Sequence, residues 1–380
     1  MGNDKEKQGK GGRMTYYFQT EKLSVGYQKR PVAEKLDIAL EKGEILTLIG
    51  PNGAGKSTVL KSIAGQLETL GGTVYLDGRD INRMSGAERS QTMAVLLTQR
   101  LRTERMTCED VAATGRYPYT GRFGILSGTD KGAVREAMEL VHVTELKDMD
   151  FTRISDGQRQ RVMLARAICQ EPEIILLDEP TSYLDIRYKL EFLSILQEMK
   201  RKKKLTVIMS LHELDLAERI SDKVLCINGM AAERFGRPEE IFTPGYLSRL
   251  FSVSAGSYDE ANGDPELPKA EGTPQVFVIA GGGSGRAVYR RLQRRGIPFA
   301  AGILFRNDLD YPTAKALAVQ VAAAESFEPI TAELVEEAKK QIDVCRAIIC
   351  CREQFGTFEQ ANQELLAYAK EHGKEIIYEV

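Results

Sequence analysis

A glycine-rich stretch at residues 50–58 constrains the fold of this chain more than any other feature of its sequence. The stretch reads Gly-Pro-Asn-Gly-Ala-Gly-Lys-Ser-Thr and satisfies the pattern G-x-x-x-x-G-K-[ST]. An apolar run at residues 45–49 precedes it, and a helix-like segment at residues 59–64 follows it. In such a strand–loop–helix unit, backbone N–H groups surround phosphates at the helix N-terminus. The sequence therefore predicts a nucleoside triphosphate site.

Chance is a poor explanation of this loop, because its four specified positions match in only about one chain in a hundred of this length. The alternative interpretation is a glycine-rich turn before an ordinary helix. In the favoured interpretation, a phosphate-binding loop, Lys56 reaches the β- and γ-phosphates and the Ser57 hydroxyl ligates Mg²⁺. The nucleotide-binding residues predicted in the loop are Gly50, Asn52, Gly53, Gly55, Lys56, Ser57 and Thr58.

Composition and charge exclude several classes of protein. The 52 Lys and Arg residues balance 54 Asp and Glu to a formal charge of −2, so no basic field draws the chain to nucleic acid or anionic lipid. The six cysteines lack the C-x-x-C spacing of metal sites and indicate reduced thiols in a cytosolic protein. No stretch approaches the roughly 20 apolar residues of a membrane helix. Residues 1–13 lack the apolar segment of a signal peptide and are expected to form a disordered leader, with Met14 as an alternative start.

Alternating strands and helices predict an α/β fold in the first part of the chain. Short β-rich stretches lead into the glycine-rich loop, and two later strands, residues 174–177 and 205–211, have the aliphatic character of buried parallel strands. A helix at residues 189–200 separates these strands, and residues 107–150 are expected to be mostly helical. The predicted fold class is a P-loop α/β domain with a helical subdomain.

A change of composition at residues 254–274, which are rich in Gly, Ser, Pro and acidic residues, is interpreted as a linker. It divides a first domain at residues 14–253 from a second domain at residues 275–380. The second domain repeats the alternation of strands and helices, which predicts a smaller, Rossmann-like α/β domain. Its expected strands lie at residues 276–280, 297–304, 346–351 and 375–380, and its expected helices at residues 286–295, 331–341 and 358–372.

The second domain contains one further loop of interest, residues 281–285, which read Gly-Gly-Gly-Ser-Gly. The loop resembles a dinucleotide-binding turn, but G-x-G-x-x-G fails in every register. Two interpretations stay open: a phosphate site aided by Arg286 and Arg290, or a tight strand–helix turn, which we favour. Residues 308–310 and 350–351 do not form a credible catalytic set, because neighbours on a strand face opposite ways. A regulatory, ligand-sensing role for this domain is a hypothesis that depends on the loop.

Two carboxylates, Asp178 and Glu179, follow the strand at residues 174–177. From this position Asp178 is expected to hold Mg²⁺ through water, opposite Ser57. Glu179 is placed to polarise an attacking water. A solvated turn is the alternative for an isolated Asp-Glu pair, but the upstream phosphate loop favours the catalytic interpretation.

Residues 154–162, Ile-Ser-Asp-Gly-Gln-Arg-Gln-Arg-Val, resemble the signature of the ATP-binding subunits of ABC transporters, which is commonly L-S-G-G-Q. The resemblance covers residues 16–251, and its motifs occur in the family's order. It implies an ATP-hydrolysing enzyme with ATP and Mg²⁺ as cofactors. It also implies roles for residues outside the loop: Ser155, Gly157 and Gln158 in the signature, Gln99 as the Q-loop glutamine and a Mg²⁺ ligand, Asp185 in the D-loop, His212 as the switch histidine and Tyr27 as the aromatic that stacks on adenine.

Two of these assignments have plain alternatives, because His212 could be a core histidine and Tyr27 a packing aromatic. In the family, the helix that follows the signature docks on the γ-phosphate held by the other subunit, and a helix N-terminus favours an anion. The resemblance therefore implies a twofold homodimer that encloses two ATP molecules. Asp156 departs from the family's usual glycine and adds a negative charge near a phosphate, unless it points away from the nucleotide.

Residues 115–119, Gly-Arg-Tyr-Pro-Tyr, resemble an element of the importer ATPases that serve iron–siderophore, haem and cobalamin permeases. In that family this insertion touches the permease, and exposed Arg and Tyr suit such a contact. A Pro-containing loop with incidental aromatics is the alternative. The resemblance implies uptake of an iron chelate or a corrinoid, with a membrane permease and a solute-binding protein as partners. It also implies a place at the cytoplasmic face of the cell membrane.

Other functions stay open beside transport. One is a non-transport ABC ATPase that acts on nucleic acid or ribosomes, with a ligand-sensing C-terminal domain. The single cassette, the near-zero net charge and residues 115–119 favour transport, so no nucleic-acid partner is expected. A weaker one is a metabolic enzyme whose chemistry lies in the second domain.

Overall fold

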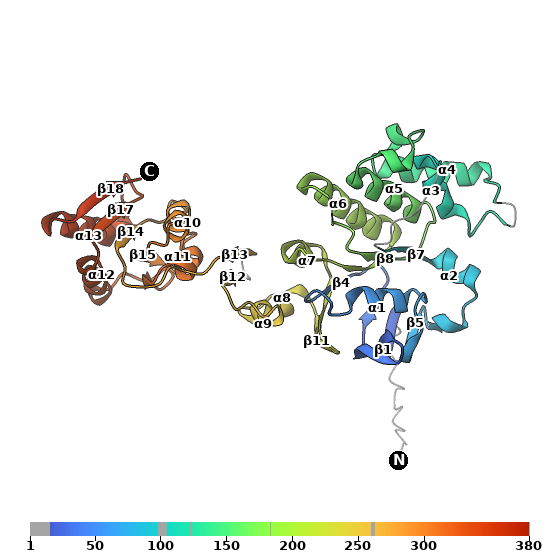
Figure 1. Cartoon of the computed structure of the whole chain (residues 1–380), viewed down its shortest axis with the longest axis horizontal. Helices are drawn as coiled ribbons and strands as arrows, with labels where there is room; N and C mark the ends of the chain where they lie inside the picture. The colour runs from blue at the N-terminus through green and yellow to red at the C-terminus, as the bar shows by residue number, and fades with distance from the viewer. Residues whose placement is uncertain (1–15, 98–104, 122–123, 183, 260–262, 380) are drawn as a thin grey trace, which may run out of the picture. The chain divides into compact units, whose positions relative to one another are not determined.

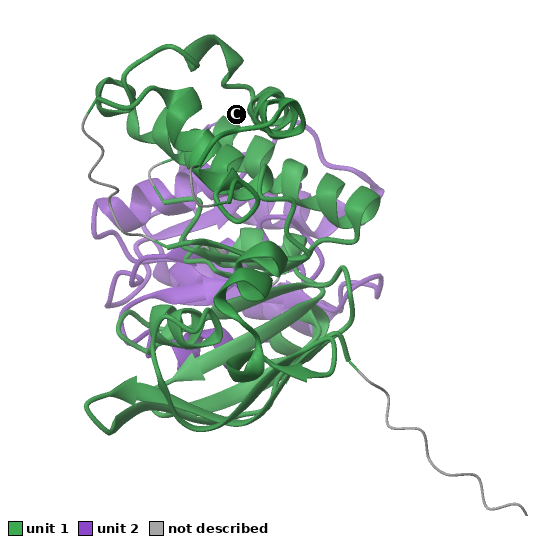
Figure 2. Cartoon of the chain, turned by 90° about the vertical axis from the view of Figure 1, so that its right-hand side faces the viewer, with its two compact units in different colours: residues 1–242 green, residues 243–380 purple. Residues whose placement is uncertain are grey.

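The computed structural model describes residues 16–97, 105–121, 124–182, 184–259 and 263–379. The chain divides into two compact units, residues 1–242 and 243–380, which Figure 2 distinguishes by colour. This division lies before residue 253, where composition ends the first domain, so helix α9 (Tyr246–Leu250) groups with the second unit. The predicted leader lies outside the described residues.

A parallel sheet forms the centre of the first unit, with the strand order β10-β4-β9-β8-β7. Its strands are β4 (Ile45–Ile49), β7 (Met93–Leu96), β8 (Ile174–Asp178), β9 (Thr206–Ser210) and β10 (Lys223–Asn228). Every residue of β4, β8 and β9 is buried, which accounts for their continuous apolar runs. The register pairs Asp178 with Ser210, so the carboxyl ends of β8 and β9 meet at one edge of the sheet.

The same sheet continues into a mostly antiparallel part through β11 (Ala231–Gly236), which pairs with β10 and β2. Its other strands are β1 (Phe18–Tyr27), β2 (Arg30–Leu36), β3 (Ala39–Leu40), β5 (Thr69–Leu76) and β6 (Arg79–Asp80). Asp77 and Gly78 connect β5 to β6, and both have positive φ. This is the turn that an Asp-Gly pair predicts between two strands.

Helix α1 (Lys56–Ile63) buries Val59, Leu60 and Ile63 in the cluster that also contains the apolar residues of the antiparallel sheet. In Figure 1, α3 to α5 gather at the top of this unit, on the side of β7 and away from β1. The other helices of the unit are α2 (Gly86–Thr92), α3 (Cys108–Ala113), α4 (Gly128–Leu140), α5 (Asp156–Ile168), α6 (Ile186–Lys203), α7 (Leu214–Ile220) and α8 (Pro238–Ile241), with the 3-10 turns η1 (Ile81–Arg83), η2 (Thr114–Arg116), η3 (Thr144–Leu146) and η4 (Phe151–Arg153).

The segment expected to be a linker contains secondary structure. Strands β12 (Ser257–Asp259) and β13 (Asp264–Glu266) pair antiparallel. Glu266 accepts hydrogen bonds from the guanidinium of Arg290, and Gln293 donates to the carbonyl of Pro268. These contacts attach part of the segment to helix α10 (Arg286–Arg294), within the second unit.

The second unit is built on a five-stranded parallel sheet with the order β16-β15-β14-β17-β18. In chain order this is 3-2-1-4-5, the arrangement of the first five strands in doubly wound sheets. The strands are β14 (Val276–Ile279), β15 (Phe299–Phe305), β16 (Gln320–Ala324), β17 (Ala347–Cys350) and β18 (Glu375–Tyr378). The helices are α10 (Arg286–Arg294), α11 (Tyr311–Leu317), α12 (Ala332–Val344) and α13 (Gln360–Glu371), with η5 (Thr357–Glu359).

Two apolar clusters cover the two faces of this sheet, one with residues of α10 and α11 and the other with residues of α12 and α13. Cys350 and Cys351 fall in different clusters, as the alternation of a strand predicts. The short helix α11 and the strand β16 are not among the elements expected from the sequence. Strand β16 reads Gln-Val-Ala-Ala-Ala, and alanine has a low preference for strands.

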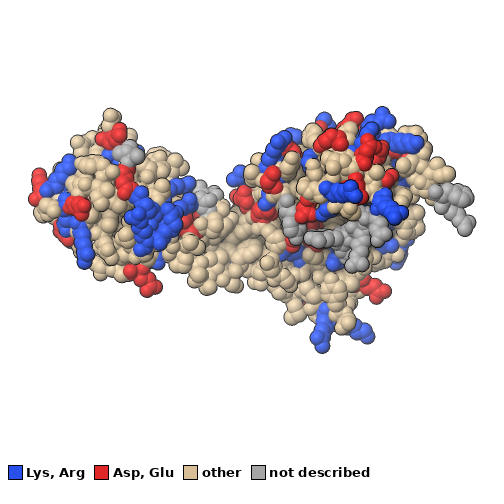
Figure 3. Space-filling view, turned by 45° about the horizontal axis from the view of Figure 1, so that its top comes forward, with Lys and Arg blue, Asp and Glu red and all other residues tan. Residues whose placement is uncertain are grey.

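The surface and the cysteines agree with the properties expected from composition. Basic and acidic side chains both cover the visible face in Figure 3, intermingled on the first unit, whereas basic ones gather in one patch on the second unit; the formal charge of the chain is −2. All six cysteines are free and buried. Across the part of the chain that the structure describes, no helix combines the length and apolar character needed to cross a membrane.

Candidate nucleotide site

The glycine-rich loop follows β4 and leads directly into α1. Gly50 has φ 149°, and a Cβ atom there would lie 2.0 Å from the carbonyl oxygen of Ile227. Gly55 has φ 100°, and a Cβ atom there would lie 2.5 Å from Val32. Both positions therefore require glycine for backbone conformation and for space. The sequence forms this loop because only glycine permits such a close approach to its neighbours.

Lys56, the first residue of α1, is buried, with its ammonium group folded over the loop. Its Nζ atom donates to the carbonyl oxygens of Gly50, at 2.7 Å, and Pro51, at 3.1 Å. Burial lowers the pKa of Lys56, and the nearby carboxylates of Glu179 and Asp178 oppose that change. The loop thus holds a positive charge beside the backbone N–H groups of a helix N-terminus, an arrangement suited to phosphate.

Ser57 and Asp178, the predicted magnesium residues, lie in contact although they are far apart in the sequence. The Ser57 hydroxyl donates to Oδ1 of Asp178 at 3.0 Å. Ser210, at the end of the neighbouring strand β9, donates to the same oxygen at 2.8 Å. One hydroxyl and one carboxylate fit the oxygen ligands that Mg²⁺ prefers, with phosphate and water as the other ligands. Their roles remain predictions.

Glu179 follows β8 in a left-handed conformation, with φ 50°. Its N–H donates to the hydroxyl of Ser210 at 2.9 Å, which fixes the backbone. Its Oε1 atom lies 2.6 Å from Nε2 of His212, and Ser182 donates to its Oε2 at 3.4 Å. The predicted base and the predicted switch histidine therefore contact each other at the edge where β8 and β9 end.

The structure adds residues to this site that the sequence did not single out. Ser210 contacts both Asp178 and the N–H of Glu179. Glu213, which follows His212, accepts a hydrogen bond from Thr181 at 2.9 Å and pairs with Lys189. A polar residue that ends the buried apolar strand β9 is a sequence signal that could have identified Ser210.

The signature residues begin helix α5. Ser155 is the N-cap, and its hydroxyl accepts from the N–H of Gln158 at 3.2 Å. The side chain of Gln158 accepts from the N–H of Ser155 at 2.9 Å, which completes a capping box. Asp156 forms an ion pair with Arg159, which lies three residues further along the helix. A Cβ atom at Gly157 would lie 3.5 Å from Leu184, an ordinary van der Waals contact, so space alone does not require glycine there.

The remaining predicted residues are dispersed along the chain. Tyr27 ends β1 and is 48% exposed, as a stacking platform must be. Asp185 is the N-cap of α6 and accepts from the N–H of Tyr188 at 3.0 Å. Thr58 is buried in α1. Gln99 lies outside the described residues, so the structure places no Q-loop glutamine.

Known proteins are similar to this chain over the glycine-rich loop and over the residues on both sides of it. Residues 33–182 match the family model described as ABC transporter. The uncharacterized ABC transporter ATP-binding protein MJ0873 of Methanocaldococcus jannaschii is 40% identical over 288 residues, which are 76% of this chain and 99% of that protein. The chain belongs to the ABC transporter ATP-binding proteins. It is therefore an ATPase of the ABC type, with ATP as its nucleotide.

Other relatives of this ABC ATPase have named cargoes of their own. The iron(3+)-hydroxamate import ATP-binding protein of Bacillus subtilis is 36% identical and aligns with 62% of this chain and 88% of its own length. The cobalamin import ATP-binding protein of Halobacterium salinarum is 31% identical and aligns with 78% of this chain and 76% of its own length.

Solved structures agree on the cassette fold. A metal-chelate type ABC transporter in an inward-facing conformation matches 63% of this chain and 90% of its own chain, with a TM-score of 0.55 and 28% identity. A cassette in its ADP conformation matches 63% of this chain and its whole own length at a TM-score of 0.57, and its 20% identity supports the fold alone. Residues 299–379 match the model of the MJ0874 family, so part of the second unit has a family of its own.

The expectation that Arg116, the arginine in residues 115–119, is exposed is wrong. Arg116 is 4% exposed, and it donates to Asp130, to Glu171 and to the carbonyl oxygen of Cys169 at 2.7 to 2.9 Å. Tyr117 and Tyr119 are exposed, at 61% and 39%. The arginine instead ties the start of the helical insertion to α4 and to the end of α5, because burial of a charged group requires partners.

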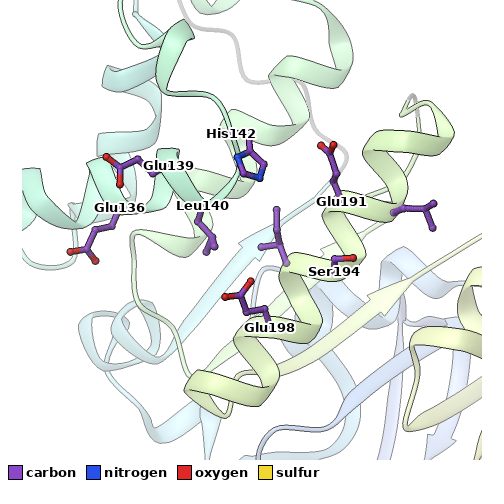
Figure 4. A pocket seen from close by; sticks show the side chains of 9 residues that line it. Glu136, Glu139, Leu140, His142, Glu191, Ser194 and Glu198 are labelled. Atoms are coloured by element: carbon purple, nitrogen blue, oxygen red, sulfur yellow. The ribbon is translucent and has the colours of Figure 1, made fainter.

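A groove of about 680 Å³ lies between α4 and α6 of the cassette, as Figure 4 shows. Leu140, Leu190 and Ile195 contribute apolar surface, and four glutamates surround it. Arg187 and Lys202 pair with two of them, Glu191 and Glu198. None of the nucleotide-motif residues lines this groove, so its size does not make it the reaction site.

The glycine-rich loop at residues 281–285 of the second unit is occupied by the protein's own carboxylates. Asp310 accepts from the N–H groups of Gly283, Gly285 and Arg286 at 2.9 to 3.2 Å. Asp308 accepts from the N–H of Gly282. Burial raises the pKa of Asp310, and the three N–H groups oppose this. The N–H groups that a phosphate would need are thus already bound, which supports a structural strand–helix turn.

Proposed function

We propose that this ABC ATPase is the ATP-hydrolysing subunit of an importer that takes up an iron chelate, such as a siderophore complex or haem, or cobalamin, through a separate membrane permease. The printed names of its relatives support this cargo class, because they include import proteins for iron(3+)-hydroxamate and for cobalamin. The motif set and the resemblance of residues 115–119 to importer ATPases support a transport role. The ATPase binds nucleotide and the permease binds cargo, so the cargo within this class is open.

Two copies act together in this proposal. The loop around Lys56 faces Ser155 of the partner subunit, and each ATP lies between them. Lys56, Ser57, Thr58 and the glycine-rich backbone bind the phosphates, and Tyr27 stacks on the adenine. ATP binding closes the two cassettes and hydrolysis reopens them, which drives the permease between its states.

Hydrolysis depends on the two carboxylates at the end of β8 and on His212, which follows β9. Ser57, Asp178 and Gln99 are the proposed ligands of Mg²⁺, which neutralises charge on the phosphates when bound. Glu179 takes the proton of the attacking water, and His212 holds Glu179 in position through the 2.6 Å contact. Asp185 in the D-loop and Gln158 in the signature complete the proposed site.

The proposed partners lie at the cytoplasmic face of the cell membrane. Tyr117 and Tyr119 expose aromatic surface on the helical insertion, and tyrosine is enriched at protein interfaces. They are the proposed contact with the permease, and a solute-binding protein would deliver the cargo to that permease. We propose the same domain limits as the sequence indicates: an ATPase domain at residues 14–253, a linker at 254–274 and a C-terminal domain at 275–380. The C-terminal domain has a regulatory role in this proposal.

One observation carries the proposal: a phosphate loop, a Ser57–Asp178 contact and a Glu179–His212 contact lie together at one sheet edge. The test is a Glu179→Gln variant of the full chain. It should lose ATP turnover and accumulate ATP-bound dimers, measured by light scattering with and without ATP. Normal turnover in this variant would contradict the role of Glu179 as base.

The cargo and the partner need a second experiment. The full chain, purified from native membranes under mild conditions, should bring a multi-span permease with it. The solute held by the associated binding protein then identifies the iron chelate or corrinoid. Recovery of ribosomes instead of a permease would favour the non-transport alternative.

A further inference from the structure

Asp156 is the first residue of α5, next to the N-cap Ser155 that the proposed function places against the γ-phosphate of the opposing site. A carboxylate at this position stabilises the helix, because the N-terminus carries partial positive charge. The same charge repels an anion that approaches that end. The charge of Asp156 therefore stabilises helix α5 in the monomer and destabilises the closed, ATP-bound dimer.

Arg159 holds this carboxylate in place. Its guanidinium forms an ion pair with Oδ1 of Asp156 and also donates to the carbonyl oxygen of Ile154 at 3.1 Å. The centre of the guanidinium lies 5.8 Å from the ring centre of Phe151. Three contacts thus fix the arginine beside the helix N-terminus. The pair is partly solvated, with 58% of the Asp156 side chain and 32% of the Arg159 side chain exposed.

We propose that the Asp156–Arg159 pair sets the ATP concentration at which two cassettes close. The inference rests on the proposed function, in which the N-terminus of α5 meets ATP bound by the partner subunit. Asp156 raises the ATP concentration required, because its charge opposes the phosphate. Arg159 lowers the requirement, because it neutralises Asp156. Both act as positioning and tuning residues and take no part in the chemical step.

The test compares variants of the full chain that also carry Glu179→Gln, so that ATP is retained. Asp156→Asn should lower the ATP concentration for half-maximal dimerisation, and Arg159→Gln should raise it. A charge at a helix N-terminus changes affinity by about two- to fivefold per site. Dimerisation is followed by light scattering over an ATP titration. Arg159→Lys, which keeps the positive charge, should restore most of the wild-type requirement.

A second comparison separates this electrostatic role from a merely structural one. If Arg159 acts by neutralising Asp156, Arg159→Gln should have much less effect when residue 156 is already asparagine. Because the pair is partly exposed, the differences between variants should also shrink in high salt. ADP binding to the monomer should not change, because α5 belongs to the opposing site.

The chain supplies a matched control in Arg153 and Asp150, an Asp–Arg pair with the same spacing and 4.0 Å between its charged atoms. Arg153→Gln should leave the ATP requirement unchanged. Dimers with an unchanged or increased ATP requirement in Asp156→Asn would overturn this inference alone. Absence of any ATP-dependent dimer in Glu179→Gln itself would overturn the proposed function, and the inference with it.

Discussion

The Nε2 atom of His212 lies 2.6 Å from Oε1 of Glu179, which joins residues that follow two adjacent parallel strands. The contact also links two backbone segments, because the N–H of Glu179 is bound to Ser210 at the end of β9. The carboxylate and the imidazole are therefore a coupled pair. Substitutions in a coupled pair are not additive.

His212→Ala should lower kcat by about a hundredfold, because it releases the proposed base Glu179, and a base held in position contributes on that order. The double variant with Glu179→Gln should be no less active than Glu179→Gln alone, since both changes disrupt one unit. Steady-state ATP hydrolysis at saturating ATP measures all three variants. Multiplicative losses in the double variant would show that the two residues act independently.

Ser210→Ala should lower kcat without a matching change in ATP affinity. Its hydroxyl contacts Asp178 and the backbone of Glu179, and a hydrogen bond to a charged group contributes about 1.5–3 kcal/mol. Turnover should fall by about tenfold to a hundredfold on this basis. Ser90→Ala on α2, whose hydroxyl contacts helix carbonyls, is the control and should leave turnover unchanged. Equal losses in both would indicate a general loss of stability.

Arg116→Met should destabilise the first unit, because it leaves the carboxylate of Asp130 without its cation and with only the hydrogen bonds from Ser127. Chemical denaturation of the full chain, followed by a probe in this unit, measures the effect. Tyr117→Ala should leave stability nearly unchanged and should weaken recovery of the permease. A stable Arg116→Met variant that fails to recover the permease would show instead that the arginine docks directly.

Asp130 predicts a pH dependence of stability. Hydrogen bonds from Ser127, followed by that from Arg116, lower the pKa of Asp130 from 3.8 to about 2. A carboxylate with a lowered pKa stabilises the folded state above its unfolded pKa, and this contribution is lost as pH falls from about 4 to 2. The difference in Tm between wild type and Asp130→Asn should therefore shrink below pH 4. A difference that stays constant down to pH 3 would contradict the role of the ionised carboxylate.

Asp310→Ala should loosen the start of α10 in the second unit. It removes the acceptor of three buried or half-buried N–H groups, and each unsatisfied group costs about 1–3 kcal/mol. Hydrogen exchange of residues 283–294 in the full chain should increase. Glu353→Gln, an exposed residue beyond β17, is the matched control. Unchanged exchange together with new binding of inorganic phosphate would revive the phosphate interpretation of the loop.

Local patterns were sufficient for the parts of the fold that depend on neighbouring residues. Glycines with positive φ, continuous apolar strands and the Asp-Gly turn are properties of short segments, and the structure contains each of them. Strand β16 escaped prediction because its alanines have a low strand preference and pair only in the tertiary structure with β15, and helix α11 because seven residues are too short for a clear helical period. The buried state of Arg116 likewise depends on Asp130 and Glu171, which no local pattern connects with it.

The order of motifs along the sequence determined the family, the phosphate loop and the identity of the charged residues, since each motif is a short run with its own backbone requirement. Tertiary structure alone decided which of these residues touch. The pairing of β8 with β9 brings Asp178, Ser210 and His212 to one edge, because parallel neighbours end together. Tertiary structure also decided that Asp310 fills the second glycine-rich loop, because a buried N–H group must find an acceptor and this one lies in the turn between β15 and α11.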